Sequence, residues 1–215
     1  MTRNNERPKD IFHERLISDY MHPYFYHKIC GAEAVERVLD KERQIMGLDA
    51  ILKYKGKEYR IDEKAATDYL NGRLRTFFLE WTFINTNGIE MYGWLSNKTL
   101  SNNYYAFIWP RSIKNDTLNS IDDIELIEIC IVAKSKIIDY LNSIGLTEEV
   151  LNEYNKDIRQ NPNKEIGDLK KNGYKVKMAN KPEHSIGVVL PISTYQRLAE
   201  IHYFVSPETL IRIKS

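Results

Sequence analysis

The sequence has little cysteine and no cluster of metal-ligand motifs. Its two cysteines, Cys30 and Cys130, lie among apolar neighbours, and the five histidines are scattered, so no Cys/His group has zinc-site spacing. We therefore expect buried thiols in a reducing compartment in preference to a disulfide. Stability must then come from an apolar core, for which a hydrophobic share of 42% is sufficient.

Long apolar segments are also lacking. The chain contains no run of about 18 apolar residues, so no transmembrane helix is predicted. The N-terminal segment MTRNNERPKD is polar and lacks the apolar region of a signal peptide. We therefore expect a soluble, cytoplasmic protein with no membrane partner.

Neither sign of charge is in excess. The 31 basic residues are matched by 30 acidic ones, which gives a formal net charge of +1. A nucleic-acid ligand would therefore require positive charge gathered locally on one face. The sequence also has no Gly-rich phosphate loop and no internal repeat, so neither a nucleotide-binding loop nor a repeat architecture is indicated.

The first part of the chain has helical character. Residues 1–22 are expected to form an arm that carries a short helix over 11–20. From about Pro23 to Arg43, apolar residues recur at helical spacing, and Pro23 suits a first helical turn. We therefore predict a second helix there, with Glu36 on a separate acidic stripe.

After residue 47 the period changes to that of β-strands. Segments 48–56 and 57–66 predict a hairpin whose turn lies at Gly56. The clearest strand is 75–85, where aromatic residues alternate on one face, and Asn87-Gly88 then marks a turn. A meander is expected to continue over 90–95 and 103–109 and to end at Pro110.

The C-terminal half alternates between strand and helix patterns. Strands are predicted over 124–133, where a buried helix is the alternative, and over 174–179 and 186–192. Helices are predicted over 134–144, over 147–160 and from Ser193 or Thr194 to about Phe204. Runs of strands beside runs of helices indicate a mixed α/β or α+β architecture. We expect a single domain over 23–215.

One segment gathers charged residues in a pattern that suits chemistry. In GLDAILKYKGKEYRIDEK, residues 47–64, Asp49 opens the first predicted strand, and Asp62 and Lys64 close the second. Because side chains alternate along a strand, Asp62 and Lys64 point to one face and Glu63 to the other. The hairpin turn places Asp49 opposite residues 62–63, so three charged groups should meet at one end of the hairpin.

This arrangement suits cleavage of phosphodiester bonds. Two carboxylates close together, Asp49 and Asp62, offer the oxygen ligands that Mg²⁺ prefers, and Mn²⁺ is the expected substitute for it. The backbone carbonyl of Glu63 could add a further ligand. A bound metal can activate a water molecule, and Lys64 offers a positive charge to that water or to the phosphate.

The pattern resembles the PD-(D/E)XK, or restriction-endonuclease-like, nuclease superfamily. The matching pieces are Gly47-Leu48-Asp49 and Ile61-Asp62-Glu63-Lys64, with Leu48 where the family name has proline. The resemblance implies a metal-dependent nuclease with a restriction-endonuclease-like core, a central mixed sheet flanked by helices. It covers roughly residues 29–110 and leaves 111–215 as extra C-terminal α/β elements.

The resemblance also implies that the first helix contributes an acidic residue, for which we choose Glu36. Gln44 is a weaker polar candidate. The expected function is a Mg²⁺-dependent endonuclease acting on nucleic acid, with double-stranded DNA as the preferred substrate and homodimerisation left open. The alternative is a catalytically inactive nucleic-acid-binding or protein-interaction module with the same fold.

Two further groups of residues have competing interpretations. Tyr104, Tyr105 and Trp109 are expected in the core, with base stacking as the alternative. A local cluster of lysines between Lys170 and Lys181 is expected to be a solvated loop, with contact to backbone phosphates as the alternative.

Overall fold

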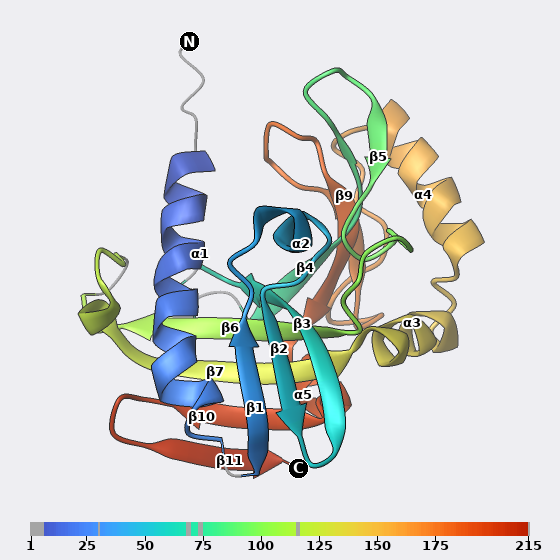
Figure 1. Cartoon of the computed structure of the whole chain (residues 1–215). Coiled ribbons are helices and arrows are strands. Elements are labelled where there is room, and N and C mark those ends of the chain that lie inside the picture. The colour runs from blue at the N-terminus through green and yellow to red at the C-terminus, as the bar shows by residue number, and fades with distance from the viewer. Residues whose placement is uncertain (1–6, 30, 68–69, 73–74, 115–116, 215) are drawn as a thin grey trace. The chain divides into compact units, whose positions relative to one another are not determined.

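The computed structural model describes residues 7–29, 31–67, 70–72, 75–114 and 117–214 (Figure 1). Its contacts divide the chain into two compact units. Unit 1 comprises Met1–Leu74, Ser101–Ala133 and Ala199–Ser215, and unit 2 comprises Arg75–Leu100 and Lys134–Leu198. Each unit is therefore assembled from segments that are separated in the sequence.

Unit 1 is built on a seven-stranded mixed sheet with the strand order β1-β2-β3-β6-β7-β10-β11. Neighbouring strands are antiparallel except β3 and β6, which are parallel. The strands are β1 (Ala32–Arg37), β2 (Ala50–Tyr54), β3 (Lys57–Ala65), β6 (Tyr104–Ser112), β7 (Ile124–Ala133), β10 (Ile201–Val205) and β11 (Leu210–Lys214). A large mixed sheet with helices confirms the mixed α/β class expected from the sequence.

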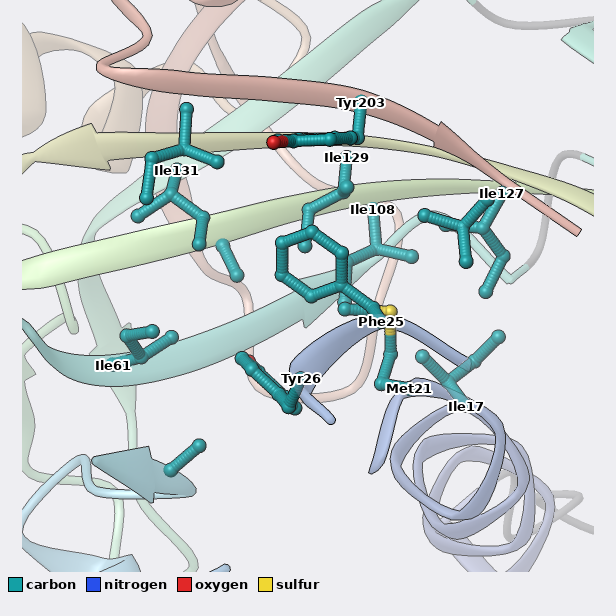
Figure 2. Packing of buried hydrophobic residues seen from close by; sticks show 14 of the residues in the cluster. Ile17, Met21, Phe25, Tyr26, Ile61, Ile108, Ile127, Ile129, Ile131 and Tyr203 are labelled. Carbon is teal, nitrogen blue, oxygen red and sulfur yellow. The ribbon is translucent and has the colours of Figure 1, made fainter. Parts of the chain in front are cut away.

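Helix α1 (Arg7–Met21) and the π-helical turn η1 (His22–Tyr26) cover one face of this sheet. Figure 2 shows Ile17, Met21 and Phe25 from these helices facing the isoleucines of β6 and β7. Ile127, Ile129 and Ile131 are fully buried there. The shorter helices of unit 1 are α2 (Lys41–Ile45), η2 (Leu70–Gly72) and η3 (Ile121–Asp123). Burial of these apolar side chains supplies the main stabilisation of unit 1.

The predicted hairpin is confirmed as β2 and β3. Lys55 and Gly56 have φ values of 51° and 71° and connect the directly paired Tyr54 and Lys57. Positive φ at both central residues is the type I′ geometry, whose twist matches that of the flanking strands. The turn thus fixes the register of the two strands that carry the candidate site residues.

The helix predicted over 23–43 is wrong, and Glu36 does not lie on a helix. Helical structure ends soon after η1, and Gly31 adopts a φ of +90°. Residues Ala32–Arg37 then form β1, in which Glu36 pairs opposite Ile51 of β2. The apolar spacing fitted a helix locally, but pairing with β2 outweighs local propensity. Leu39, part of the supposed apolar stripe, is 76% exposed.

Unit 2 contains a four-stranded antiparallel sheet with the order β5-β4-β9-β8. Its elements are β4 (Thr76–Ile84), β5 (Glu90–Tyr92), α3 (Lys134–Ser143), α4 (Glu148–Gln160), β8 (Lys175–Met178), β9 (Ile186–Pro191) and α5 (Ile192–Leu198). Thr147 caps α4 by accepting a hydrogen bond from the Val150 N–H at 3.4 Å. The strands and helices predicted over residues 75–85 and 134–192 are confirmed.

Two other predictions are corrected. The segment 103–109 does not continue the meander, because β6 joins the sheet of unit 1 and passes through Pro110. The last predicted helix ends at Leu198, and Ile201–Val205 forms β10 instead. This segment is rich in β-branched and aromatic residues, and its pairing with β7 decides its structure.

Candidate functional site

Asp49 lies at the open end of the β2–β3 hairpin, as the sequence predicts. Its N–H donates to the carbonyl oxygen of Ile61 at 2.9 Å, and its Oδ2 accepts from the N–H of Glu63 at 2.8 Å. Asp49 directly precedes β2, whose first residue, Ala50, is paired opposite Ile61, and the negative charge of Asp62 is among the causes that raise the pKa of Asp49. The two carboxylates therefore lie near enough to interact electrostatically at the open end of the hairpin.

Asp62 and Lys64 share one face of β3. Lys64 Nζ lies 2.5 Å from Asp62 Oδ1, and the Asp62 side chain is nearly buried. In the parallel ladder with β6 their partners are Tyr105 and Phe107, both fully buried. The ion pair therefore stands on a rigid central strand rather than on a loop.

The Glu63 side chain points the other way, toward η1 and α1. Its Oε1 accepts a hydrogen bond from the Tyr26 hydroxyl at 2.8 Å, and Ser18 also hydrogen-bonds this carboxylate. Burial raises the pKa of Glu63, while the bonds from Tyr26 and Ser18 and the charge of Arg37 oppose that rise. The role expected for the Glu63 carbonyl, as a metal ligand, stays a prediction.

The carboxylates influence each other electrostatically. Burial, followed by the negative charges of Asp62 and Glu63, raises the pKa of Asp49 to about 7. Burial lowers the pKa of Lys64, but the charge and hydrogen bond of Asp62 outweigh it and the pKa is raised overall. The site thus holds a lysine that stays charged and an aspartate that is poised to lose a proton near neutral pH.

The other acidic and polar candidates lie differently. Glu36 is exposed and forms an ion pair with Arg43. Gln44 donates from Nε2 to the carbonyl oxygen of Val38 at 3.0 Å. The negative charge of Glu14, in α1, contributes to the raised pKa of Lys64. Sequence reasoning missed Glu14, although it lies within the short helix expected over 11–20.

The aromatic and lysine groups have distinct environments. Tyr104, Tyr105 and Trp109 are 4%, 0% and 6% exposed, so they belong to the core and are not available as a base-stacking platform. In unit 2, Lys175 forms an ion pair with Glu165 at 2.6 Å. The exposed Lys170 belongs to a turn stabilised by Asp168.

A second group of chemistry-bearing residues was not recognised in the sequence. Glu128, Cys130 and His202 are all buried, and their ligand-type atoms lie within 4.8 Å of one another. His202 Nε2 is 3.0 Å from Glu128 Oε1. Cys130 is a buried thiol, as predicted, whereas Cys30 lies outside the described residues. The one available signal was Glu-Ile-Cys in an apolar strand, which puts Glu128 and Cys130 on one face.

Unit 2 has a surface cavity of about 480 Å³ between its β4–β5 hairpin and α4. Its lining combines polar and apolar side chains, namely Thr82, Glu90, Met91, Tyr92, Asn152, Asn155 and Lys156. None of the predicted site residues contributes to this cavity.

No protein-family model, curated protein or solved structure matches the chain. In the part of the chain that the structure describes, no helix combines the length and apolar character needed to cross a membrane.

Proposed function

We propose that the protein is a metal-dependent nuclease of the restriction-endonuclease-like type, which hydrolyses phosphodiester bonds in double-stranded DNA. The observation that supports this most directly lies at the open end of the hairpin, where the charge of Asp62 acts on Asp49 and Lys64 Nζ is 2.5 Å from Asp62 Oδ1. The mixed sheet with α1 on one face is compatible with the core that this resemblance implies.

Asp49 and Asp62 are the proposed ligands of Mg²⁺ or Mn²⁺, which would supply an activated water and charge stabilisation at the phosphate. The N–H of Glu63 holds the Asp49 carboxylate in place, so its orientation is set by the hairpin backbone. Lys64 directs a fixed positive charge to the same face as Asp62. In this proposal that charge stabilises the negative charge that develops during cleavage.

One observation favours the alternative, a binding module without activity. Lys64 already compensates Asp62, and Asp49 already accepts a backbone hydrogen bond, so the same contacts would serve as a structural clasp of the hairpin. In that case the charges stabilise unit 1 and bind no metal. The two proposals therefore differ in whether divalent ions bind at Asp49 and Asp62 and support cleavage.

The deciding experiment incubates the protein with supercoiled plasmid, linear duplex and single-stranded DNA, and RNA, in Mg²⁺, Mn²⁺ or EDTA. We expect nicking or linearisation of plasmid that needs metal and that Asp62→Asn abolishes. The matched control is Asp122→Asn, because Asp122 is an exposed carboxylate of unit 1. Absence of cleavage with every substrate and ion would favour the inactive module. Cleavage that survives Asp62→Asn would locate the active site elsewhere.

A further inference from the structure

The second face of the seven-stranded sheet carries a compact set of metal-ligand side chains on β7 and β10. Glu128 and Cys130 are two positions apart on β7, so they share a face, and Cys130 is directly paired with His202 of β10. This face is opposite to that of Ile129 and Tyr203, which Figure 2 shows directed toward Phe25. The cluster therefore lies away from the core that α1 covers.

The donor set is one thiol, one imidazole and one carboxylate. Their ligand-type atoms lie within 4.8 Å of one another, and His202 Nε2 and Glu128 Oε1 are 3.0 Å apart. Ligands at zinc distances of about 2.0–2.3 Å in a tetrahedral site stand about 3.5 Å from each other. Small rotations of these side chains would therefore bring all three to one ion.

The three side chains are buried, so a positive charge beside the Glu128 carboxylate would be stabilising. Glu128, Cys130 and His202 are 7%, 0% and 5% exposed, and the β6 partners of Cys130 and Glu128 are the aromatic Phe107 and Trp109. A carboxylate in so apolar a strand is costly unless it is paired. His202 provides one partner, and a divalent ion would compensate both the carboxylate and a deprotonated thiol.

We propose that Glu128, Cys130 and His202 form a binding site for a zinc-class transition metal ion. Thiolate and imidazole ligands select such ions over Mg²⁺, whereas Asp49 and Asp62 offer oxygen alone. Three protein ligands leave a fourth position for water or another donor. The ion would link β7 to β10, whose residues are distant in the sequence. This proposal does not rest on the nuclease function, since its ligands and its metal class are different.

The test uses the full chain, freed of metal by a chelator and then titrated with Co²⁺. Thiolate coordination gives cobalt(II) an intense near-ultraviolet charge-transfer band, and tetrahedral geometry adds visible bands. We expect one Co²⁺ per chain to give the charge-transfer band, and that ion to be displaced by Zn²⁺ but not by a large excess of Mg²⁺. Zinc should also raise the melting temperature of the metal-free protein, because it binds the folded state.

Variants assign the ligands. Cys130→Ser should abolish the charge-transfer band, and His202→Gln or Glu128→Gln should weaken zinc binding on the order of 100-fold. Cys30→Ser controls for the other thiol and should keep the band. Asp62→Asn should also keep it, which separates this site from the proposed nuclease centre.

Two results would overturn the proposal. One is a parent protein that shows neither the cobalt band nor a zinc-dependent rise in melting temperature. The other is a band that persists in Cys130→Ser but is lost in Cys30→Ser. Should Cys130→Ser fail to fold, the zinc content of the dialysed parent and of His202→Gln decides, and equal content in the two also overturns the assignment. A buried Glu–His hydrogen bond beside an inert thiol is then the correct description.

Discussion

The backbone N–H of Glu63 donates a hydrogen bond to Oδ2 of Asp49 at 2.8 Å, across the end of the β2–β3 hairpin. The carboxylate is therefore oriented by main-chain geometry before any ligand arrives. It is also half-buried and lies near other carboxylates, which is why its pKa is raised to about 7. Because its charged form is disfavoured by burial and by neighbouring negative charges, the protonation of Asp49 should respond strongly to pH and to bound cations.

The first prediction concerns the stability of metal-free protein. Between the ordinary pKa of 3.8 and the folded value of about 7, Asp49 holds a proton in the folded state but not in the unfolded state. The free energy of unfolding should therefore fall as pH rises through this window. Asp49→Asn should reduce that slope, leaving the contribution of Glu63, whose pKa is shifted in the same direction. Urea unfolding in EDTA at a series of pH values measures the dependence of the unfolding free energy on pH.

The control for this experiment is Asp122→Asn, which removes an exposed carboxylate and should keep the parent slope. Above pH 7, Asp49→Asn should be as stable as the metal-free parent or more so, because a buried charge has been removed. A large loss of stability at that pH would instead show that the Asp49 carboxylate is a structural acceptor for the Glu63 N–H.

The second prediction concerns metal binding. Asp49→Asn and Asp62→Asn should each lose detectable Mn²⁺ affinity in titration calorimetry, since each removes one of two proposed charged ligands. Parent affinity should weaken as pH falls below about 7, because a proton competes with the ion for Asp49. Unchanged Mn²⁺ affinity in both variants would exclude the site.

The third prediction separates catalysis from binding at Lys64. Lys64→Met keeps the apolar stem and removes the charge, so Mn²⁺ should still bind, while cleavage should fall on the order of 10²-fold. Lys64→Arg should restore little activity, because a planar guanidinium differs from a compact ammonium. Lys53→Met, on an exposed position of the same hairpin, is the control. Parent-level cleavage by Lys64→Met would remove Lys64 from the mechanism.

The fourth prediction compares two buried tyrosines. Tyr26 donates to Glu63 at 2.8 Å, so Tyr26→Phe should cost about 1–3 kcal/mol by depriving a partly buried carboxylate of a donor. The hydroxyl of Tyr54 has no hydrogen-bond partner among the described residues, so Tyr54→Phe should be neutral or slightly stabilising. Equal effects of the two changes on the urea midpoint would contradict the assignment of the Tyr26–Glu63 bond as a stabilising contact.

Local signals in the sequence were sufficient to predict the hairpin. A glycine turn and strict alternation determine which residues face each other, so the meeting of Asp49 with Asp62 and Lys64 followed from spacing. The same reasoning failed for Glu36, because the apolar spacing of 23–43 fits a helix, whereas pairing with β2 makes Ala32–Arg37 a strand.

The cluster of Glu128, Cys130 and His202 could not be predicted from the sequence for a related reason. It depends on the pairing of β7 with β10, and nothing near His202 in the sequence reveals that its neighbour is Cys130. Similarly, the parallel pairing of β3 with β6 depends on a long excursion of the chain, so local patterns suggested a simple meander for residues 103–109. Sites built across distant strands need the topology before they can be seen.

The alternation of the chain between its two units affects how the protein can form. Segments of unit 1 are interrupted by Arg75–Leu100 and by Lys134–Leu198, which together make unit 2. Neither unit is therefore a contiguous stretch that could be cut out and expressed alone. Pairing β3 with β6, or β4 with β9, requires closing long loops. The chain loses conformational entropy in closing them before the strand contacts contribute any stabilisation. Slow refolding and sensitivity to internal deletion are the expected consequences.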